Sequence, residues 1–212
     1  MEEMIMKKRY INELIDSSRG AVLRSGEVLL PDADRVKAAN RVNLLALGDV
    51  GGTVLMGLRL LGGEAVGQIG IYDLDPAMMR RYEMEINQIC FPDGRTLPEV
   101  RMLEQDELFD CDMFVFCASK GVPPVGAAGD VRMAQLEANS QLVGIYADMA
   151  VKAGFGGIFA VVSDPVDPLC KAAVLSGLAP EQVQGYGLGV MNGRASYFAA
   201  KDQRFSQYLR DG

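Results

Sequence analysis

Short apolar runs alternate with amphipathic segments from residue 41 onward in this 212-residue chain. Near-continuous apolar runs are typical of strands buried on both faces, and apolar residues spaced three or four apart are typical of helices. The predicted strands are 42–47, 68–72, 99–103, 113–117, 157–162 and 183–186. The predicted helices are 51–62, 76–89, 130–152, 165–175 and 193–210. In the first helix, the spacing places Leu55, Leu58 and Leu61 on one face.

This alternation of strands and helices predicts an α/β fold. Parallel strands joined by right-handed helical crossovers give a doubly wound sheet of six strands between two helical layers, a three-layer α/β/α arrangement. Ligands of such sheets bind at the carboxyl ends of the strands. The loops to examine are therefore 48–53, 73–76, 117–130 and 163–166.

The pattern divides the chain into three parts. Residues 1–40 show only weak helical spacing and are interpreted as an N-terminal extension. Residues 41–190 hold the strand–helix alternation and form the predicted domain. Residues 191–212 are interpreted as a helical tail that begins a further, catalytic domain not present in this chain.

Composition narrows the classes of function. A net charge of −7 argues against nucleic acid as a partner, because its phosphates require a basic surface. No stretch approaches the roughly 20 apolar residues of a membrane helix. Four cysteines without C-x-x-C spacing fit a reduced, cytoplasmic compartment. The chain has no histidine, which removes the commonest general base and any histidine-based zinc site or Ser-His-Asp triad. We expect no metal site.

One turn resembles a dinucleotide-binding fingerprint. The stretch ALGDVG (46–51) follows a predicted strand and opens a helix, with alanine in place of the first glycine of G-x-G-x-x-G. Gly48 would let a pyrophosphate approach the backbone, and Gly51 would let the helix pack closely on the strand. The helix N-terminus would supply N–H donors and a partial positive charge. The alternative, a glycine-rich turn without a ligand, stays open.

An acidic residue follows at the expected distance. Asp73 ends the second predicted strand, 22 residues after Gly51, where a carboxylate accepts hydrogen bonds from the adenosine ribose. With Asp75 nearby, it would repel a 2′-phosphate, so the sequence favours NAD over NADP. The cofactor-binding residues predicted from the turn and this strand are Ala46, Gly48, Asp49, Val50, Gly51 and Asp73.

Later segments carry a resemblance to a known family. They are FVFCASKG (114–121), AGDVRMAQLEANSQLV (128–143), VVSDPVDPLCKAAVLSGLAPEQVQGYG (161–187) and NGR (192–194). In this order they resemble the lactate/malate dehydrogenase family, whose members typically carry T-N-P-V-D where this chain has SDPVD. The resemblance covers residues 41–194 and implies a Rossmann fold, NAD as cofactor, and hydride transfer between NAD and a 2-hydroxy/2-oxo acid.

The resemblance also implies roles for individual residues. Arg132 matches the mobile-loop arginine that polarises the substrate carbonyl, and Arg194 matches the arginine that grips the substrate carboxylate. Each could instead be an ordinary surface arginine. Four small polar or apolar residues match positions around the cofactor, although ordinary loop polarity explains them equally well. Ser163 and Asn139 match the nicotinamide half, and Ala118 and Ser119 match the turn past the adenosine ribose and pyrophosphate.

The departures from the family pattern concern catalysis. Asp164 replaces the expected asparagine and, as a carboxylate, cannot donate a hydrogen bond to substrate. Met191 replaces the aspartate that normally orients the catalytic histidine, and that histidine would fall beyond residue 212. The loop before Arg132 has no second arginine, so malate is not supported as substrate. We therefore expect this chain alone to bind NAD without turnover, either as part of a longer dehydrogenase-like protein or as a natural non-catalytic relative.

Alternative functions remain open. A nucleotide-sensing or scaffolding module would explain Asp164 and Met191 as marks of a decayed site. An NAD-dependent glycosidase of related fold would need a metal site, against which the lack of histidine argues. Family members commonly pair through the helix that matches 51–62, so the resemblance also predicts a homo-oligomer.

Overall fold

The computed structural model describes residues 40–63, 65–92, 96–120 and 135–205. Residues 1–39 of the predicted extension, Arg132 and the last residues of the predicted tail lie outside these ranges, whereas Asn40, the last residue of that extension, begins the first strand. Six strands form one sheet in the order β3-β2-β1-β4-β5-β6, and every neighbouring pair is parallel. The strands are β1 (Asn40–Leu45), β2 (Val66–Tyr72), β3 (Glu99–Met102), β4 (Met113–Phe116), β5 (Ile158–Val161) and β6 (Val183–Gly185). The predicted doubly wound sheet is confirmed.

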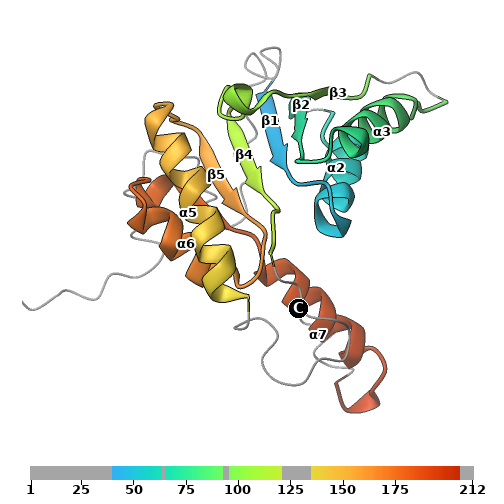
Figure 1. Cartoon of the computed structure of the whole chain (residues 1–212). Coiled ribbons are helices and arrows are strands. Elements are labelled where there is room, and N and C mark those ends of the chain that lie inside the picture. The colour runs from blue at the N-terminus through green and yellow to red at the C-terminus, as the bar shows by residue number, and fades with distance from the viewer. Residues whose placement is uncertain (1–39, 64, 93–95, 121–134, 206–212) are drawn as a thin grey trace, which may run out of the picture.

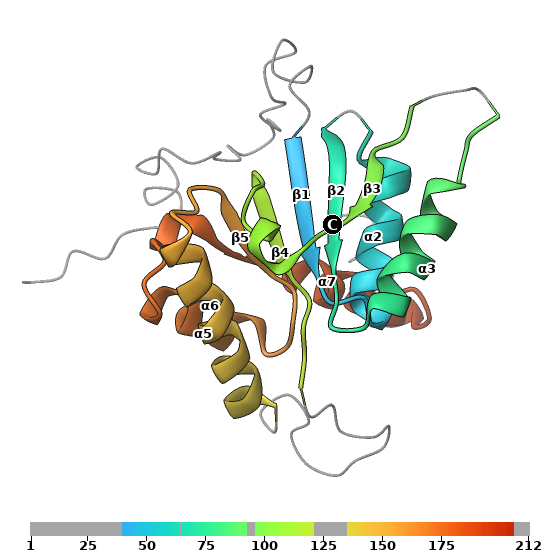
Figure 2. The same ribbon diagram turned by 45° about the horizontal axis from the view of Figure 1, so that its top comes forward.

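Helices cover both faces of this sheet, as Figures 1 and 2 show. The α-helices are α2 (Asp49–Leu61), α3 (Pro76–Asn87), α5 (Leu136–Lys152), α6 (Val166–Leu175) and α7 (Leu188–Ala199). Short 3-10 turns lie at η1 (Gln105–Glu107), η2 (Pro180–Gln182) and η3 (Gln203–Phe205). The helices α2 and α3 pack on one face, α5 and α6 on the other, and α7 extends from the carboxyl edge.

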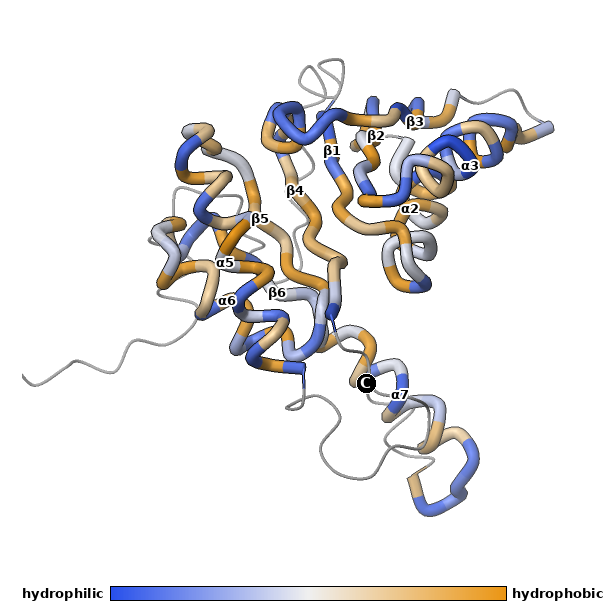
Figure 3. The backbone as a smooth tube through the Cα atoms, viewed as in Figure 1, coloured by the Kyte–Doolittle hydropathy of each residue, from blue (hydrophilic) through white to orange (hydrophobic). Residues whose placement is uncertain are grey.

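The core has two halves because side chains alternate along each strand. One half packs against α5 and α6 and is dominated by aromatic residues of the strands, with Phe114, Phe116 and Phe159 fully buried. The other half packs against α2 and α3 and is aliphatic, with members such as Leu44, Ile69, Ile71, Leu55 and Val115. Figure 3 shows the hydrophobic residues running along β4 and β5 between the helical layers. The strands are therefore buried from both sides, as the sequence pattern predicts.

Two details of the helices differ from the prediction. On α2, Leu55 is buried, but Leu61 is 87% exposed and Arg59 is buried at 7% exposure. The Arg59 guanidinium donates to the carbonyls of Pro98, Asn87 and Ile89, so polar bonds rather than apolar packing fill this part of the helix face.

The final α-helix also begins earlier than predicted. It starts at Leu188, directly after Gly187, and ends at Ala199 instead of running from 193 to 210. Its residues are mostly exposed, including Leu188 and Val190, so burial could not define its beginning from the sequence.

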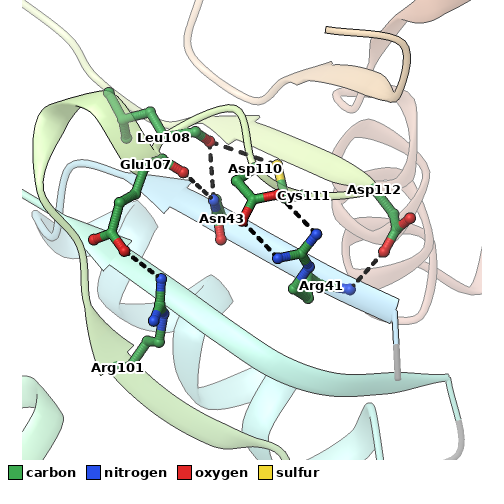
Figure 4. A network of polar contacts seen from close by, with 8 residues as sticks. All are labelled: Arg41, Asn43, Arg101, Glu107, Leu108, Asp110, Cys111 and Asp112. Atoms are coloured by element: carbon green, nitrogen blue, oxygen red, sulfur yellow. Dashed lines mark hydrogen bonds and ion pairs between the residues drawn. The ribbon is translucent and has the colours of Figure 1, made fainter. Parts of the chain in front are cut away.

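Polar contacts close the amino edge of the sheet, opposite the candidate site (Figure 4). The Arg41 guanidinium bonds the Asp110 carboxylate at 2.7 and 2.8 Å, and the Arg41 N–H donates to Asp112. The buried Asn43 donates to the carbonyls of Glu107 and Leu108. These bonds hold β1 against the segment that leads into β4, so the amino ends of the two central strands are held together.

Candidate functional site

The predicted glycine turn, residues 46–51, joins β1 to α2 at the carboxyl edge of the sheet. Ala46 has a φ of +72°, in the left-handed region that favours glycine. Its N–H still donates to the Tyr72 carbonyl at 2.8 Å, which continues the pairing of β1 with β2. The position that lost the fingerprint's first glycine therefore keeps the backbone conformation that a glycine would supply.

The other two glycines of the turn have different surroundings. A Cβ atom on Gly51 would overlap the carbonyl oxygen of Ala46 and lie 3.5 Å from the Cβ atom of Cys117. A Cβ atom on Gly48 would meet nothing within 4 Å. Gly51 is thus required by close packing of α2 on the turn, whereas Gly48 faces open space where a ligand can approach the backbone.

The N-terminus of α2 is open toward the same space. Gly48 is the N-cap residue and supplies no side-chain cap, and Gly48, Asp49 and Val50 are exposed. The first N–H groups of a helix have no partner within the helix and carry the positive end of its dipole. This end of α2 can therefore receive an anionic group such as a phosphate.

Asp73 lies at the end of β2, beside the glycine turn. Its carboxylate accepts the Leu47 N–H at 2.7 Å and the Asp75 N–H at 3.0 Å. Asp75 in turn caps α3 by accepting the Ala77 N–H at 2.9 Å. The structure thus brings the predicted ribose-binding carboxylate into direct contact with the predicted phosphate turn.

A second group of predicted residues meets around Asn139, near the start of α5. This side chain is fully buried. Its oxygen accepts the Lys120 N–H at 2.7 Å, and its amide donates to the Ser119 hydroxyl at 3.1 Å and to the Asp164 carbonyl at 2.8 Å. Asn139 therefore ties together the loops that follow β4 and β5. We will call Asn139, Ser119, Lys120 and Asp164 the loop clasp.

Ser163 belongs to the same region but bonds differently. It is buried, and its hydroxyl donates to the Ala118 carbonyl at 2.7 Å. The Asp164–Pro165 peptide bond that follows is cis. The polar atoms of Asn139 and Ser163 thus bond protein groups that shape the loops, and their place beside the nicotinamide half of a cofactor stays a prediction.

Of the predicted substrate arginines, the structure describes Arg194, and its side chain is joined to neither group. Arg194 is exposed on α7, which begins at the carboxyl edge and runs away from the sheet (Figure 2). Met191, on the same helix, is 42% exposed. Arg132 lies outside the described residues, so its predicted role is not addressed.

Sequence reasoning missed one side chain of this edge. Gln135 is 7% exposed and accepts the Ser119 hydroxyl at 2.8 Å. It stands one helical turn before Asn139, at the N-cap position of α5. The predicted helix of 130–152 places it inside a helix, so no signal in the sequence indicated it. The bond between Ser119 and Gln135 joins the loop after β4 to the start of α5.

The cysteine behind the glycine turn is not a nucleophile at neutral pH. Burial raises the pKa of the Cys117 thiol to about 12, because the charged thiolate is poorly solvated there. Among the described residues, no three potential metal ligands cluster. The described helices include none with both the length and the hydropathy that crossing a membrane requires.

Comparison with known proteins agrees with this architecture. No protein-family model matches the chain. An L-lactate dehydrogenase of Oceanobacillus iheyensis is 28% identical over 166 residues, covering 76% of this chain and 48% of that enzyme. L-lactate dehydrogenase 1 of Staphylococcus aureus is 30% identical over 149 residues, covering 70% of this chain and 45% of that enzyme. The chain spans about half the length of the curated relatives it matches.

Solved structures show the same fold. A lactate dehydrogenase from a Medee basin deep-sea metagenome superposes with a TM-score of 0.64 at 22% identity, over 77% of this chain and 50% of that one. The malate dehydrogenase of Cryptosporidium parvum gives a TM-score of 0.58 at 19% identity, over 69% of this chain and 45% of that one. The lactate dehydrogenase of Eimeria maxima, solved with NADH and oxamate, gives a TM-score of 0.55 at 18% identity, over 70% of this chain and 44% of that one.

The sheet order and the glycine turn define a Rossmann-type α/β domain. By sequence, the chain is a distant homologue of the L-lactate dehydrogenases, matching their N-terminal, Rossmann-type half. The resemblance inferred from the sequence motifs is confirmed at this level.

Proposed function

We propose that this chain binds NAD(H) at the carboxyl edge of its sheet, as the NAD-binding half of a lactate/malate dehydrogenase-like oxidoreductase. The inherited reaction is hydride transfer between NAD and a 2-hydroxy/2-oxo acid, which would be its small-molecule partner. The observation that carries the proposal is the pairing of an open α2 N-terminus at Gly48 with the Asp73 carboxylate beside it. These are the features that receive the pyrophosphate and the adenosine ribose in Rossmann folds.

We further propose that the 212-residue chain alone does not reduce 2-oxo acids. Reduction of a carbonyl by hydride needs a proton donor for the developing alkoxide, and histidine is the residue best suited to that role near neutral pH. The chain contains no histidine, and Met191 stands where the family pattern places the partner aspartate.

Titration calorimetry tests both statements. NAD and NADH are titrated into the purified chain, and pyruvate turnover is followed by NADH absorbance. Binding of NADH without turnover is expected. Absence of binding overturns the cofactor proposal, and measurable turnover overturns the proposal of inactivity.

An NAD(H)-sensing or scaffolding module is the second candidate function. Asp164 and Met191 favour it, because they change substrate-side positions while the glycine turn is kept. Oxamate, a 2-oxo acid analogue, discriminates the two. If oxamate tightens NADH binding, a substrate site is present and the dehydrogenase-like function is favoured, whereas NADH binding that is indifferent to oxamate favours the sensor.

Self-association is also proposed. On α2, the exposed residues include Val50 at 52%, Met56 at 45% and Leu61 at 87%, and such an apolar surface is typical of interfaces. Light scattering should give a mass above the 22.9 kDa of one chain, and Met56→Glu should lower it.

A further inference from the structure

The Asp73 carboxylate is bonded to the backbone through both of its oxygens. One oxygen accepts the N–H of Leu47, in the glycine turn, at 2.7 Å. The other accepts the N–H of Asp75, in the loop that leads to α3, at 3.0 Å. A half-buried carboxylate with charge-assisted bonds of this kind holds two loops at a fixed separation.

The bond from Leu47 acts at a critical place in the turn. Ala46 donates its N–H to Tyr72, and Leu47 donates its N–H to Asp73, so two successive residues of the turn are tied to the last residue of β2 and to the residue that follows it. Ala46 has a φ of +72°, which an alanine adopts only when its surroundings impose it. Gly48, which follows Leu47, is the exposed N-cap residue of α2.

We propose that Asp73 is a positioning residue for the glycine turn, in addition to any contact with a ribose. It holds the backbone of residues 46–48 in the shape that presents the α2 N-terminus to a pyrophosphate. This inference rests on the proposed function, since it concerns the same nucleotide site. It follows that affinity for a diphosphate depends on Asp73 even when the ligand has no 2′-hydroxyl group.

The inference also links cofactor choice to turn geometry. A carboxylate is an acceptor at both oxygens, whereas asparagine would present an amide donor to one of the two N–H groups. Serine is too short to span both loops. A substitution designed to admit a 2′-phosphate therefore also loosens the turn that binds the pyrophosphate shared by NAD and NADP.

The test compares ADP with 2′,3′-dideoxy-ADP, which has neither ribose hydroxyl group, by calorimetry. The proteins are the wild-type chain, Asp73→Ser and the matched control Asp75→Ser, which removes the same charge from the same loop and leaves a residue able to cap α3. We expect Asp73→Ser to weaken 2′,3′-dideoxy-ADP binding about tenfold, which corresponds to loss of one charge-assisted hydrogen bond. Asp75→Ser should change it by less than about threefold.

A role limited to the ribose predicts a different result. Asp73→Ser would then weaken ADP binding but leave 2′,3′-dideoxy-ADP binding at the wild-type value, and this outcome overturns the inference. If the wild-type chain binds neither ADP nor NAD, the proposed function fails, and the inference fails with it, which is a distinguishable result.

Circular dichroism establishes that the variants are folded at the temperature of the titration. If Asp73→Ser does not fold, Asp73→Asn replaces it, because its amide oxygen can still accept the Leu47 N–H. A smaller loss of 2′,3′-dideoxy-ADP affinity is expected for Asp73→Asn, and an unchanged affinity overturns the inference. A lower melting temperature with unchanged affinity marks a merely structural role and also overturns it.

Discussion

Gly51 lies so close to Ala46 that a Cβ atom on Gly51 would overlap the Ala46 carbonyl oxygen. The first turn of α2 is therefore pressed against the end of β1. The two residues meet because the chain reverses between them, with Ala46 in a left-handed conformation. This contact sets how closely the helix N-terminus approaches the sheet edge, and it separates structural from ligand-facing positions in the turn.

Gly51→Ala should lower stability, whereas Gly48→Ala should lower affinity for NAD. Gly51→Ala forces the first turn of α2 away from the backbone of Ala46 and is expected to destabilise the domain by about 3 kcal/mol. Gly48→Ala places its methyl group in open space, so stability should change by no more than about 1 kcal/mol, while NAD binding weakens at least about tenfold because the methyl group faces the ligand. Urea unfolding and calorimetry measure the two effects. Equal stability of the two variants would contradict the packing argument.

Ala46→Gly should stabilise the domain. An alanine at a φ of +72° carries a conformational cost of about 1–2 kcal/mol, which is partly offset by the larger unfolded-state entropy of glycine. A net gain of about 0.5–1 kcal/mol is expected in urea unfolding. Ala172→Gly, in the middle of α6, is the control and should lower stability by about 1 kcal/mol. A loss of stability for Ala46→Gly would show that the alanine methyl packing outweighs the backbone cost.

Asn139→Ala should destabilise the domain strongly. It leaves the Lys120 N–H and the Asp164 carbonyl without their bonds to the buried Asn139 side chain, in a partly buried region, which costs about 1–3 kcal/mol. Gln141→Ala, on an exposed site of the same helix, is the control and should change stability by less than about 0.5 kcal/mol. If the two variants unfold at the same urea concentration, the loop clasp contributes nothing to stability.

Alkylation should discriminate among the cysteines. Cys90 is exposed, whereas burial raises the pKa of both Cys111 and Cys117 to about 12. Only the thiolate reacts, and a raised pKa keeps these two thiols protonated until the pH rises toward 12. Iodoacetamide at pH 8 should therefore label Cys90 much faster than either of them, as followed by peptide mass spectrometry. The urea-unfolded chain is the control, and labelling of Cys117 at the rate of Cys90 in the folded chain would contradict the prediction.

The sheet could be predicted from the sequence because its strands are buried on both faces. Each predicted strand overlaps an observed one, and the alternation with helices was sufficient to predict a doubly wound sheet. The predicted helix faces are wrong where a polar residue is buried or an apolar residue is exposed. Arg59 is buried through bonds to backbone carbonyls of a distant loop, and Leu61 is exposed, which a helical spacing rule cannot anticipate.

The candidate site was predictable in part. Gly48 and Gly51 follow a pattern set by local backbone geometry, so the sequence alone located the turn. The bonds of Asn139 depend on two loops that precede and follow it in the chain, and no local pattern reports that they converge. Residue matching singled out Asn139 but gave no sign of these bonds, and its place beside the cofactor stays a prediction.

The order of the strands has a consequence for how the chain is made. The central strand β1 pairs with β4, and Val42 aligns with Met113. A ribosome that adds roughly 5–20 residues per second delivers β4 several seconds after β1. During this interval the apolar side chains of β1 lack one of their two neighbouring strands, and long-range parallel pairing is slow to form. The pace of synthesis therefore limits when the nascent core can close.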